Sequence, residues 1–137
     1  MQKAVRSILI FLAVAVLFVQ GSTVAQTTEK LPLVLVVYAD WCPMCQKLKP
    51  TLAKINEKYY GKIHFVRFDI TSEETTVKSK RQALKLGLGE FFEKNKDKTS
   101  LVVIQDSAGR EVFRALSDYD PRHYEAVLDK QLRETQK

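Results

Sequence analysis

The chain has 137 residues, 45% of them hydrophobic, and carries a formal net charge of +6 at pH 7. This length is enough for one small domain with its own core and excludes two domains of ordinary size. The lysines are interspersed with acids, as in residues 90–98, which is typical of a solvated face and argues against nucleic-acid binding.

The first 25 residues have the pattern of a secretory signal peptide. Lys3 and Arg6 form a basic region, residues 8–19 are an unbroken apolar run, and residues 23–25 are small enough for cleavage. The 12-residue apolar run reaches about 18 Å as a helix, short of a hydrocarbon core of about 30 Å. We therefore predict a cleaved signal peptide over residues 1–25.

Cleavage leaves a mature domain of residues 26–137, exported to the periplasm or another extracytoplasmic compartment. The alternative is an uncleaved N-terminal anchor, with residues 8–25 as a membrane tether. Such compartments are oxidising, so a pair of cysteines there forms a disulfide unless something reduces it.

The first part of the domain predicts a strand, a helix and a second strand. Residues 31–39 are nearly all apolar and rich in valine, as expected of a central strand covered on both faces. From Pro43 to about Tyr60 the apolar spacing is helical, and Pro50 inside this helix predicts a kink. In residues 63–70 apolar and polar side chains alternate enough to predict a second strand.

A second helix and a hairpin are predicted next. The capping-box signature at residues 71–74 predicts a helix that runs to about Leu86, whereas residues 91–98 give no clear pattern. Residues 101–104 and 111–116 read as strands joined by a turn at residues 106–109.

The last helix should begin with Asp120 as N-cap and Pro121 at the first helical position. The order of elements is then βαβαββα. It predicts an α/β fold with a central mixed four-stranded sheet flanked by helices.

Between the first strand and the first helix lies Trp41-Cys42-Pro43-Met44-Cys45, which contains both cysteines of the chain. Two thiols separated by two residues at a helix start are the sequence form of a redox disulfide. Unsatisfied N–H groups and the helix dipole favour the thiolate of Cys42, so we predict Cys42 as nucleophile and Cys45 as resolving residue. A structural disulfide is the alternative, disfavoured because so small a loop constrains few unfolded conformations.

Residues 37–45, with Pro50 five residues after the second cysteine, resemble the active-site strand, turn and first helix of thioredoxins. The resemblance extends over residues 31–132 and is weaker over residues 75–98. It implies a thioredoxin-like fold and a thiol-disulfide oxidoreductase that needs no metal and no cofactor beyond the Cys42-Cys45 disulfide. With its leader and its Cys-Pro sequence, the chain is most similar to periplasmic members of the family, including those that serve cytochrome c maturation.

The resemblance also implies partners and a substrate groove. The partners would be protein thiols and disulfides, together with a membrane or soluble electron donor, and we expect a monomer. The groove candidates are Trp41, Pro43, Met44, Thr99 and Ser100.

The chain departs from the family pattern before the third strand, where thioredoxins usually have a cis-proline that faces the cysteines. That position falls on Ser100, preceded by Thr99. A cis bond before serine costs about 2.5–4 kcal/mol, so we expect a trans peptide and an altered groove. Replacing Ser100 by proline is then expected to raise activity on generic substrates, provided that the local backbone can adopt the cis form.

A second departure is Val36, which stands where cytoplasmic thioredoxins bury an acid that helps to deprotonate the second cysteine. The attack of Cys45 that releases the substrate from a mixed disulfide with Cys42 should then be slower, or it should be assisted by another group.

The remaining polar candidates have ordinary interpretations. His64 and His123 do not have zinc-finger spacing to the cysteines. Lys47 and Lys49 on the first helix are expected to be solvated.

The leading hypothesis is an exported thiol-disulfide oxidoreductase that acts as a reductant rather than an oxidant. Two alternatives stay open: a non-catalytic thioredoxin-like binding module, and a metal chaperone or sensor that uses the same thiols.

Overall fold

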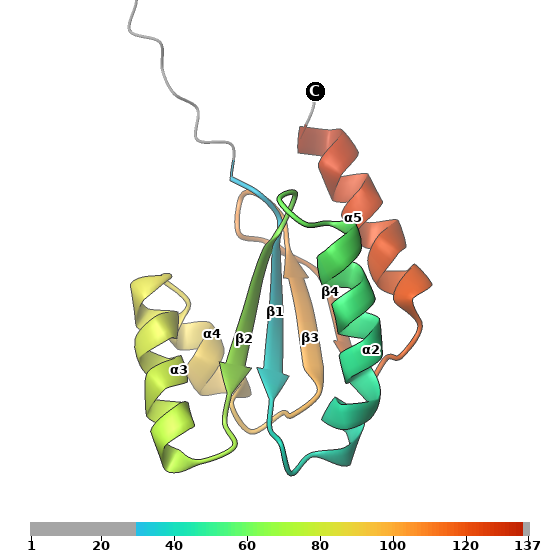
Figure 1. The fold of residues 1–137 in the computed structure, drawn as a ribbon. Coiled ribbons are helices and arrows are strands. Elements are labelled where there is room, and N and C mark those ends of the chain that lie inside the picture. The colour runs from blue at the N-terminus through green and yellow to red at the C-terminus, as the bar shows by residue number, and fades with distance from the viewer. Residues whose placement is uncertain (1–29, 136–137) are drawn as a thin grey trace, which may run out of the picture.

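The computed structural model describes residues 30–135. These residues form eight elements in chain order (Figure 1). They are β1 (Leu33–Tyr38), α2 (Pro43–Lys58), β2 (His64–Asp69), α3 (Glu73–Lys85), α4 (Gly89–Asn95), β3 (Leu101–Gln105), β4 (Glu111–Leu116) and α5 (Pro121–Thr135).

The four strands form one mixed sheet in the order β2-β1-β3-β4. β1 pairs in parallel with β2 and antiparallel with β3, and β3 pairs antiparallel with β4. β1 is therefore an interior strand, which explains its unbroken apolar sequence. The predicted α/β fold with a central mixed four-stranded sheet is confirmed.

Helices cover both faces of the sheet, with α2 and α5 on one side and α3 and α4 on the other (Figure 1). Alternate residues of β1 separate accordingly: Val34 and Val36 join the core under α2 and α5, while Leu35 and Val37 join the core under α3 and α4. The two cysteines belong to the first of these cores. The site is thus part of the α2 and α5 layer.

One helix boundary and one additional helix differ from the sequence prediction. The N-cap of α3 is Ser72, which exchanges side-chain hydrogen bonds with Thr75, whereas the capping box was expected over residues 71–74. The region left without a pattern contains α4, a seven-residue helix without a side-chain cap. The element order is therefore βαβααββα. The predicted hairpin and the last helix are confirmed.

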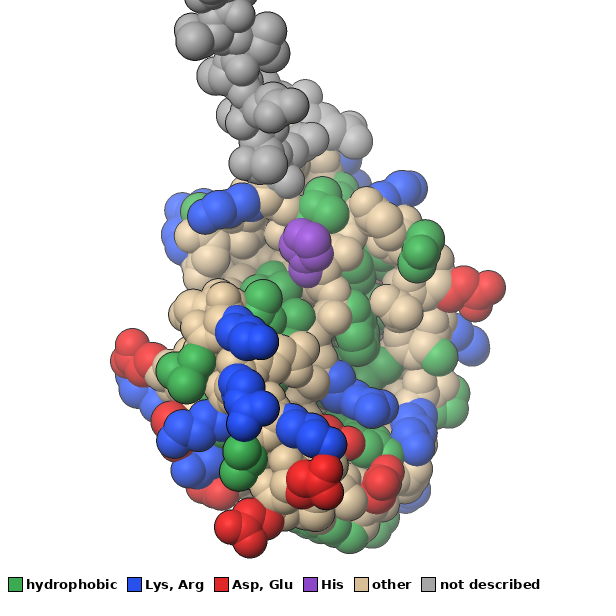
Figure 2. All heavy atoms as spheres, turned by 60° about the vertical axis from the view of Figure 1, so that its left-hand side comes forward, with side chains coloured by type: hydrophobic (Ala, Val, Ile, Leu, Met, Phe, Trp, Pro, Cys, Tyr) green, Lys and Arg blue, Asp and Glu red, His purple; other side chains and the backbone are tan. Residues whose placement is uncertain are grey.

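The predicted signal peptide and the alternative anchor lie outside the described residues. Within residues 30–135, no helix is both long enough and apolar enough to span a membrane. Figure 2 shows basic and acidic side chains interspersed over the face that it presents, consistent with a solvated surface.

Candidate redox site

The two cysteines lie where the chain leaves β1 and begins α2. Cys42 is the N-cap of α2, with φ −88° and ψ 110°, and its Sγ accepts a hydrogen bond from the backbone N–H of Cys45 at 3.2 Å. Pro43 follows at the first helical position, where a missing N–H costs nothing because it has no intrahelical partner. The sequence thus places the Cys42 sulfur at the positive end of the helix dipole.

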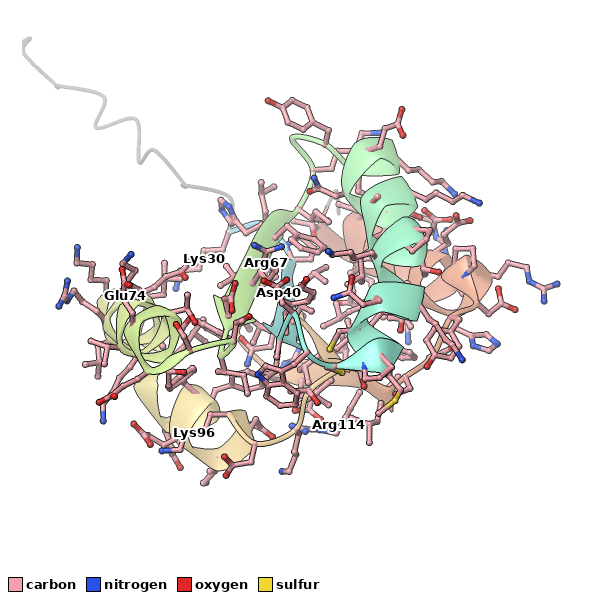
Figure 3. All side chains as sticks on the ribbon, turned by 60° about the horizontal axis from the view of Figure 1, so that its bottom comes forward. Lys30, Asp40, Arg67, Glu74, Lys96 and Arg114 are labelled. Carbon is pink, nitrogen blue, oxygen red and sulfur yellow. The ribbon has the colours of Figure 1, made fainter. Side chains whose placement is uncertain are left out.

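The loop before Cys42 is fixed by the loop that follows β2. The backbone N–H of Asp40 donates to Thr71 Oγ1 at 2.9 Å, and the indole N–H of Trp41 donates to the Thr71 carbonyl at 3.2 Å. Thr71 is fixed in turn because its own N–H donates to Asp69 Oδ1 at 2.9 Å. Figure 3 looks onto this end of the sheet. Thr71 is a positioning residue that the sequence analysis did not identify.

Both cysteines are free thiols and both are nearly fully buried, with 1% of Cys42 and 3% of Cys45 exposed. Trp41 and Met44, by contrast, are exposed large hydrophobic side chains, and Pro43 is exposed beside them. These three residues form an apolar rim around the buried pair.

The two thiols have opposite pKa shifts. Burial alone would raise the pKa of Cys42, but hydrogen bonds from the Cys45 thiol, the Thr99 hydroxyl and nearby backbone N–H groups outweigh it and lower the pKa below 9.0. Burial raises the pKa of Cys45 to about 11, and its hydrogen bond to Cys42 adds to the effect. At neutral pH the thiolate is therefore concentrated on Cys42.

Thr99 and Ser100 have different surroundings. Thr99 is half-buried and its hydroxyl interacts with Cys42, while Ser100 is 1% exposed and contacts Cys45 through its backbone. The Ser100 hydroxyl lies 2.6 Å from the Ser117 hydroxyl. Ser100 is therefore a buried support of the groove, and Thr99 supplies the side chain that reaches the nucleophile.

The backbone at Ser100 contradicts the expectation that proline there would raise activity. The described residues contain no cis peptide bond, so the expected trans bond before Ser100 is confirmed. Ser100 has a φ of 65°, however, and its N–H donates to the Val37 carbonyl at 2.9 Å. Proline fixes φ near −65° and has no N–H, so it cannot replace Ser100 in this backbone.

Val36 is fully buried in the core with the cysteines. The interactions that set the pKa of Cys45 come from Cys42, Ala39 and Ser100, and within the described residues no carboxylate is among them. No carboxylate of the described residues thus takes the place of the family's buried acid, and slower or assisted resolution by Cys45 stays a prediction.

The histidines lie apart from the thiols. His64 begins β2, and His123 Nδ1 lies 2.7 Å from Asp118 Oδ2 at the start of α5. Residues 30–135 contain no cluster of three histidine, cysteine, aspartate or glutamate side chains suited to a metal ion.

Alkylation should reveal the order of reactivity. We expect iodoacetamide to modify Cys42 before Cys45 in the reduced protein near neutral pH, because only the thiolate reacts and the pKa of Cys42 is lowered while that of Cys45 is raised. The pH profile of labelling at Cys42 should have its inflection below 9.0. Peptide mapping after short exposures measures both rates. Faster labelling of Cys45 would reverse the roles.

The comparisons with known proteins agree on one family. The Thioredoxin family model matches residues 18–84. Thioredoxin C-2 of Corynebacterium nephridii is 38% identical over 48 residues, which cover 34% of this chain and 44% of that protein. The thiol:disulfide interchange protein TxlA homolog of Synechocystis sp. is 33% identical over 43 residues, which cover 31% of this chain and 24% of that protein. The chain thus matches less than half the length of these curated relatives.

A solved structure supports the fold. The thiol:disulfide interchange protein of the thioredoxin family from Chlorobium tepidum TLS superposes with a TM-score of 0.53 at 12% identity, over 76% of this chain and 81% of that one. The mixed sheet, the helices on both faces and the Cys42-Cys45 pair at the start of α2 fit the same family. Together these findings support membership of the thioredoxin superfamily.

Proposed function

We propose that this protein is an exported thiol-disulfide oxidoreductase that reduces protein disulfides through Cys42 and Cys45. The observation that carries the proposal is the Cys42 thiol at the N-cap of α2, with a lowered pKa beside a second thiol whose pKa is raised. Cys42 is thus favoured as the attacking thiolate, while Cys45 stays protonated until the mixed disulfide has formed.

The reaction transfers two electrons. The Cys42 thiolate attacks one sulfur of a substrate disulfide, forms a mixed disulfide and releases the first substrate thiolate. Cys45 then loses its proton and attacks the Cys42 sulfur, which releases the second substrate thiolate and leaves the Cys42-Cys45 disulfide. The substrate has gained two electrons, and a thiol donor must supply two to restore the reduced protein.

Export and the reducing direction rest on different arguments. The leader pattern over residues 1–25 supports export, because it combines a basic start, an apolar run and small residues. An exported reductant in an oxidising compartment needs a membrane or soluble electron donor. The relatives named thioredoxin and thiol:disulfide interchange protein support the exchange reaction.

The exposed rim of Trp41, Pro43 and Met44 supports an extended or unfolded protein segment as substrate. A flat aromatic ring and a flexible thioether offer apolar contact without fixed shape, which suits varied polypeptides. A non-catalytic binding module would use the same rim without requiring the pKa difference between the thiols.

Reduction of insulin by dithiothreitol in the presence of the protein tests the activity. We expect catalysis by the native protein and none by Cys42→Ser, which keeps the size of the side chain but removes the nucleophile. The equilibrium potential of the pair against dithiothreitol buffers tests the direction, with an expected value nearer about −270 mV than about −120 mV. A potential near the upper value would make the protein an oxidant, and no catalysis by the native protein would favour the binding module.

A further inference from the structure

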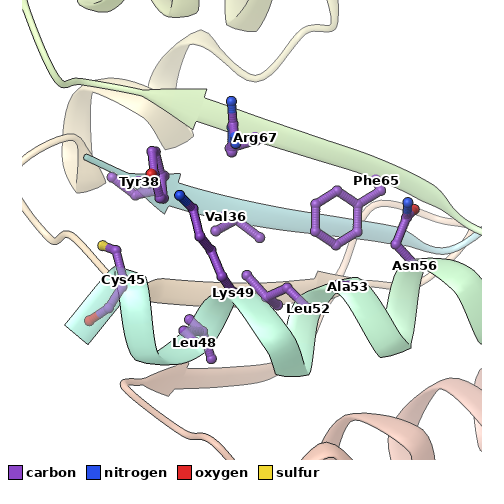
Figure 4. Close-up of a pocket in the computed structure, with 12 residues that line it drawn as sticks. Val36, Tyr38, Cys45, Leu48, Lys49, Leu52, Ala53, Asn56, Phe65 and Arg67 are labelled. Atoms are coloured by element: carbon purple, nitrogen blue, oxygen red, sulfur yellow. The ribbon is translucent and has the colours of Figure 1, made fainter. Parts of the chain in front are cut away.

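A cavity of about 180 Å³ lies beside the redox site, between α2 and the strands β1 and β2 (Figure 4). Cys45 lines one end and Asn56 the other. Asn56 follows Cys45 by eleven positions on the helix, a rise of about 16 Å. The cavity is thus long and narrow, and its occupant must be slender.

The walls of the cavity are mostly apolar side chains. Val36 contributes from β1, Phe65 from β2, and Leu48 and Leu52 from α2. Leu52 and Phe65 are only partly buried, although both pack against the core. Figure 2 shows a hollow lined by hydrophobic side chains, with basic side chains at its margin. An apolar chain that lies along the groove would remove the most apolar surface of these walls from water, and its binding free energy would therefore be the most favourable.

Two cationic side chains line the cavity beside its apolar walls. Lys49 from α2 and Arg67 from β2 both reach the cavity, and both lie over the ring of Tyr38, with Lys49 Nζ 5.3 Å and Arg67 Cζ 4.7 Å from its centroid. Figure 4 shows Lys49 extending from α2 toward β1, with Arg67 on the neighbouring strand β2. Opposed cations at one opening attract a single anionic group.

Nearby carboxylates neutralise the charges of Lys49 and Arg67 only in part, which leaves both side chains able to attract an anion. The nearest carboxylate to Arg67 is that of Asp69, at a long 3.9 Å, and it already accepts from Thr71. Lys49 has Tyr38 as its partner, and Asp40 acts on it only through charge at longer range. Asp40 in turn accepts a hydrogen bond from the Tyr38 hydroxyl.

From this geometry we propose that the cavity binds a medium-chain fatty carboxylate. The carboxylate lies between Lys49 and Arg67, and the alkyl chain runs along Val36, Leu52 and Phe65 toward Asn56. Charge selects the head group, and the narrow apolar groove selects a slender tail over a bulky ring. The ligand is noncovalent, and its tail points away from Cys45.

Octanoate is the probe that tests the proposal. Titration into the protein, followed by methyl resonances of Val36, Leu48 and Leu52, should show saturable binding at this cavity. Each added methylene should strengthen binding by about fourfold from butanoate upward until the groove is filled. Octanol has the same tail without the charge and should bind about tenfold more weakly than octanoate.

Charge variants provide the decisive comparison. Lys49→Gln and Arg67→Gln should each weaken octanoate binding by about fivefold or more. Lys47→Gln, a matched change on the same helix that does not line the cavity, should change the affinity by less than about twofold. Equal affinities for octanol and octanoate, unchanged binding in both cavity variants, or shifts confined to Trp41 and Met44 would each overturn the proposal.

Discussion

Replacing Cys45 by alanine should convert the protein into a trap for its substrates and abolish catalytic turnover. The attacking thiol remains at the N-cap of α2. It loses the hydrogen bond from the Cys45 thiol, the largest of the interactions that lower its pKa, but keeps those from the Thr99 hydroxyl and the backbone N–H groups. Attack by Cys42 therefore survives, whereas the thiol that would release the mixed disulfide is gone. Non-reducing electrophoresis and mass spectrometry after incubation with oxidised insulin measure the covalent adduct.

The reciprocal variant is the matched control. Cys42→Ala retains the Cys45 thiol, but burial raises the pKa of that thiol, so it should capture no partner at neutral pH. Both variants keep a small side chain at a buried position, so differences in folding should be slight. Adducts with Cys42→Ala and none with Cys45→Ala would show that Cys45 is the nucleophile.

The fold is predictable from the sequence because most of its elements have strong local signals. An unbroken apolar run can be buried only in the interior of a sheet, and β1 is indeed flanked by β2 and β3. Asp120 caps α5 as predicted, since its carboxylate accepts from the N–H of Arg122 at 2.9 Å. In both places the local pattern and the tertiary position agree.

α4 could not be predicted because its local signals are poor. It begins at Gly89, a residue with low helix propensity, after Leu88, which offers no capping side chain. What holds it is tertiary packing: Phe92 is buried and its ring lies 5.4 Å from that of Phe68 on β2. Burial against the sheet outweighs the weak propensity.

The Cys42-Cys45 pair was visible in the sequence, whereas its surroundings were not. The contact of Trp41 with Thr71 joins residues 30 positions apart, and Lys49 and Arg67 line one cavity only because α2 packs against the sheet beside β2. The positive φ of Ser100 has no sequence signal either, since glycine is the usual residue for that backbone. Such details depend on how the elements pack.

The packing around Ser100 predicts that Ser100→Pro destabilises the protein severely. The substitution removes the hydrogen bond from the Ser100 N–H to the buried Val37 carbonyl, and it also removes the Ser100 hydroxyl that pairs with Ser117. It also forces φ from 65° to about −65°, which displaces the chain just before β3. Together these losses should cost at least about 3 kcal/mol, a large part of a typical stability of about 5–15 kcal/mol. Urea unfolding followed by Trp41 fluorescence measures the change.

Two neighbouring substitutions separate the backbone effect from the chemistry of the site. Ser100→Gly adopts the same φ without strain and loses only the hydroxyl pair, so its unfolding free energy should stay within about 1.5 kcal/mol of the native value. Thr99→Val keeps the shape of the side chain but removes the hydroxyl that lowers the pKa of Cys42, so it should raise that pKa with little loss of stability. The ultraviolet absorbance of the thiolate against pH measures that pKa. Native-like stability of Ser100→Pro would mean that this backbone accepts proline and that the constraint at Ser100 is weaker than its φ and hydrogen bond indicate.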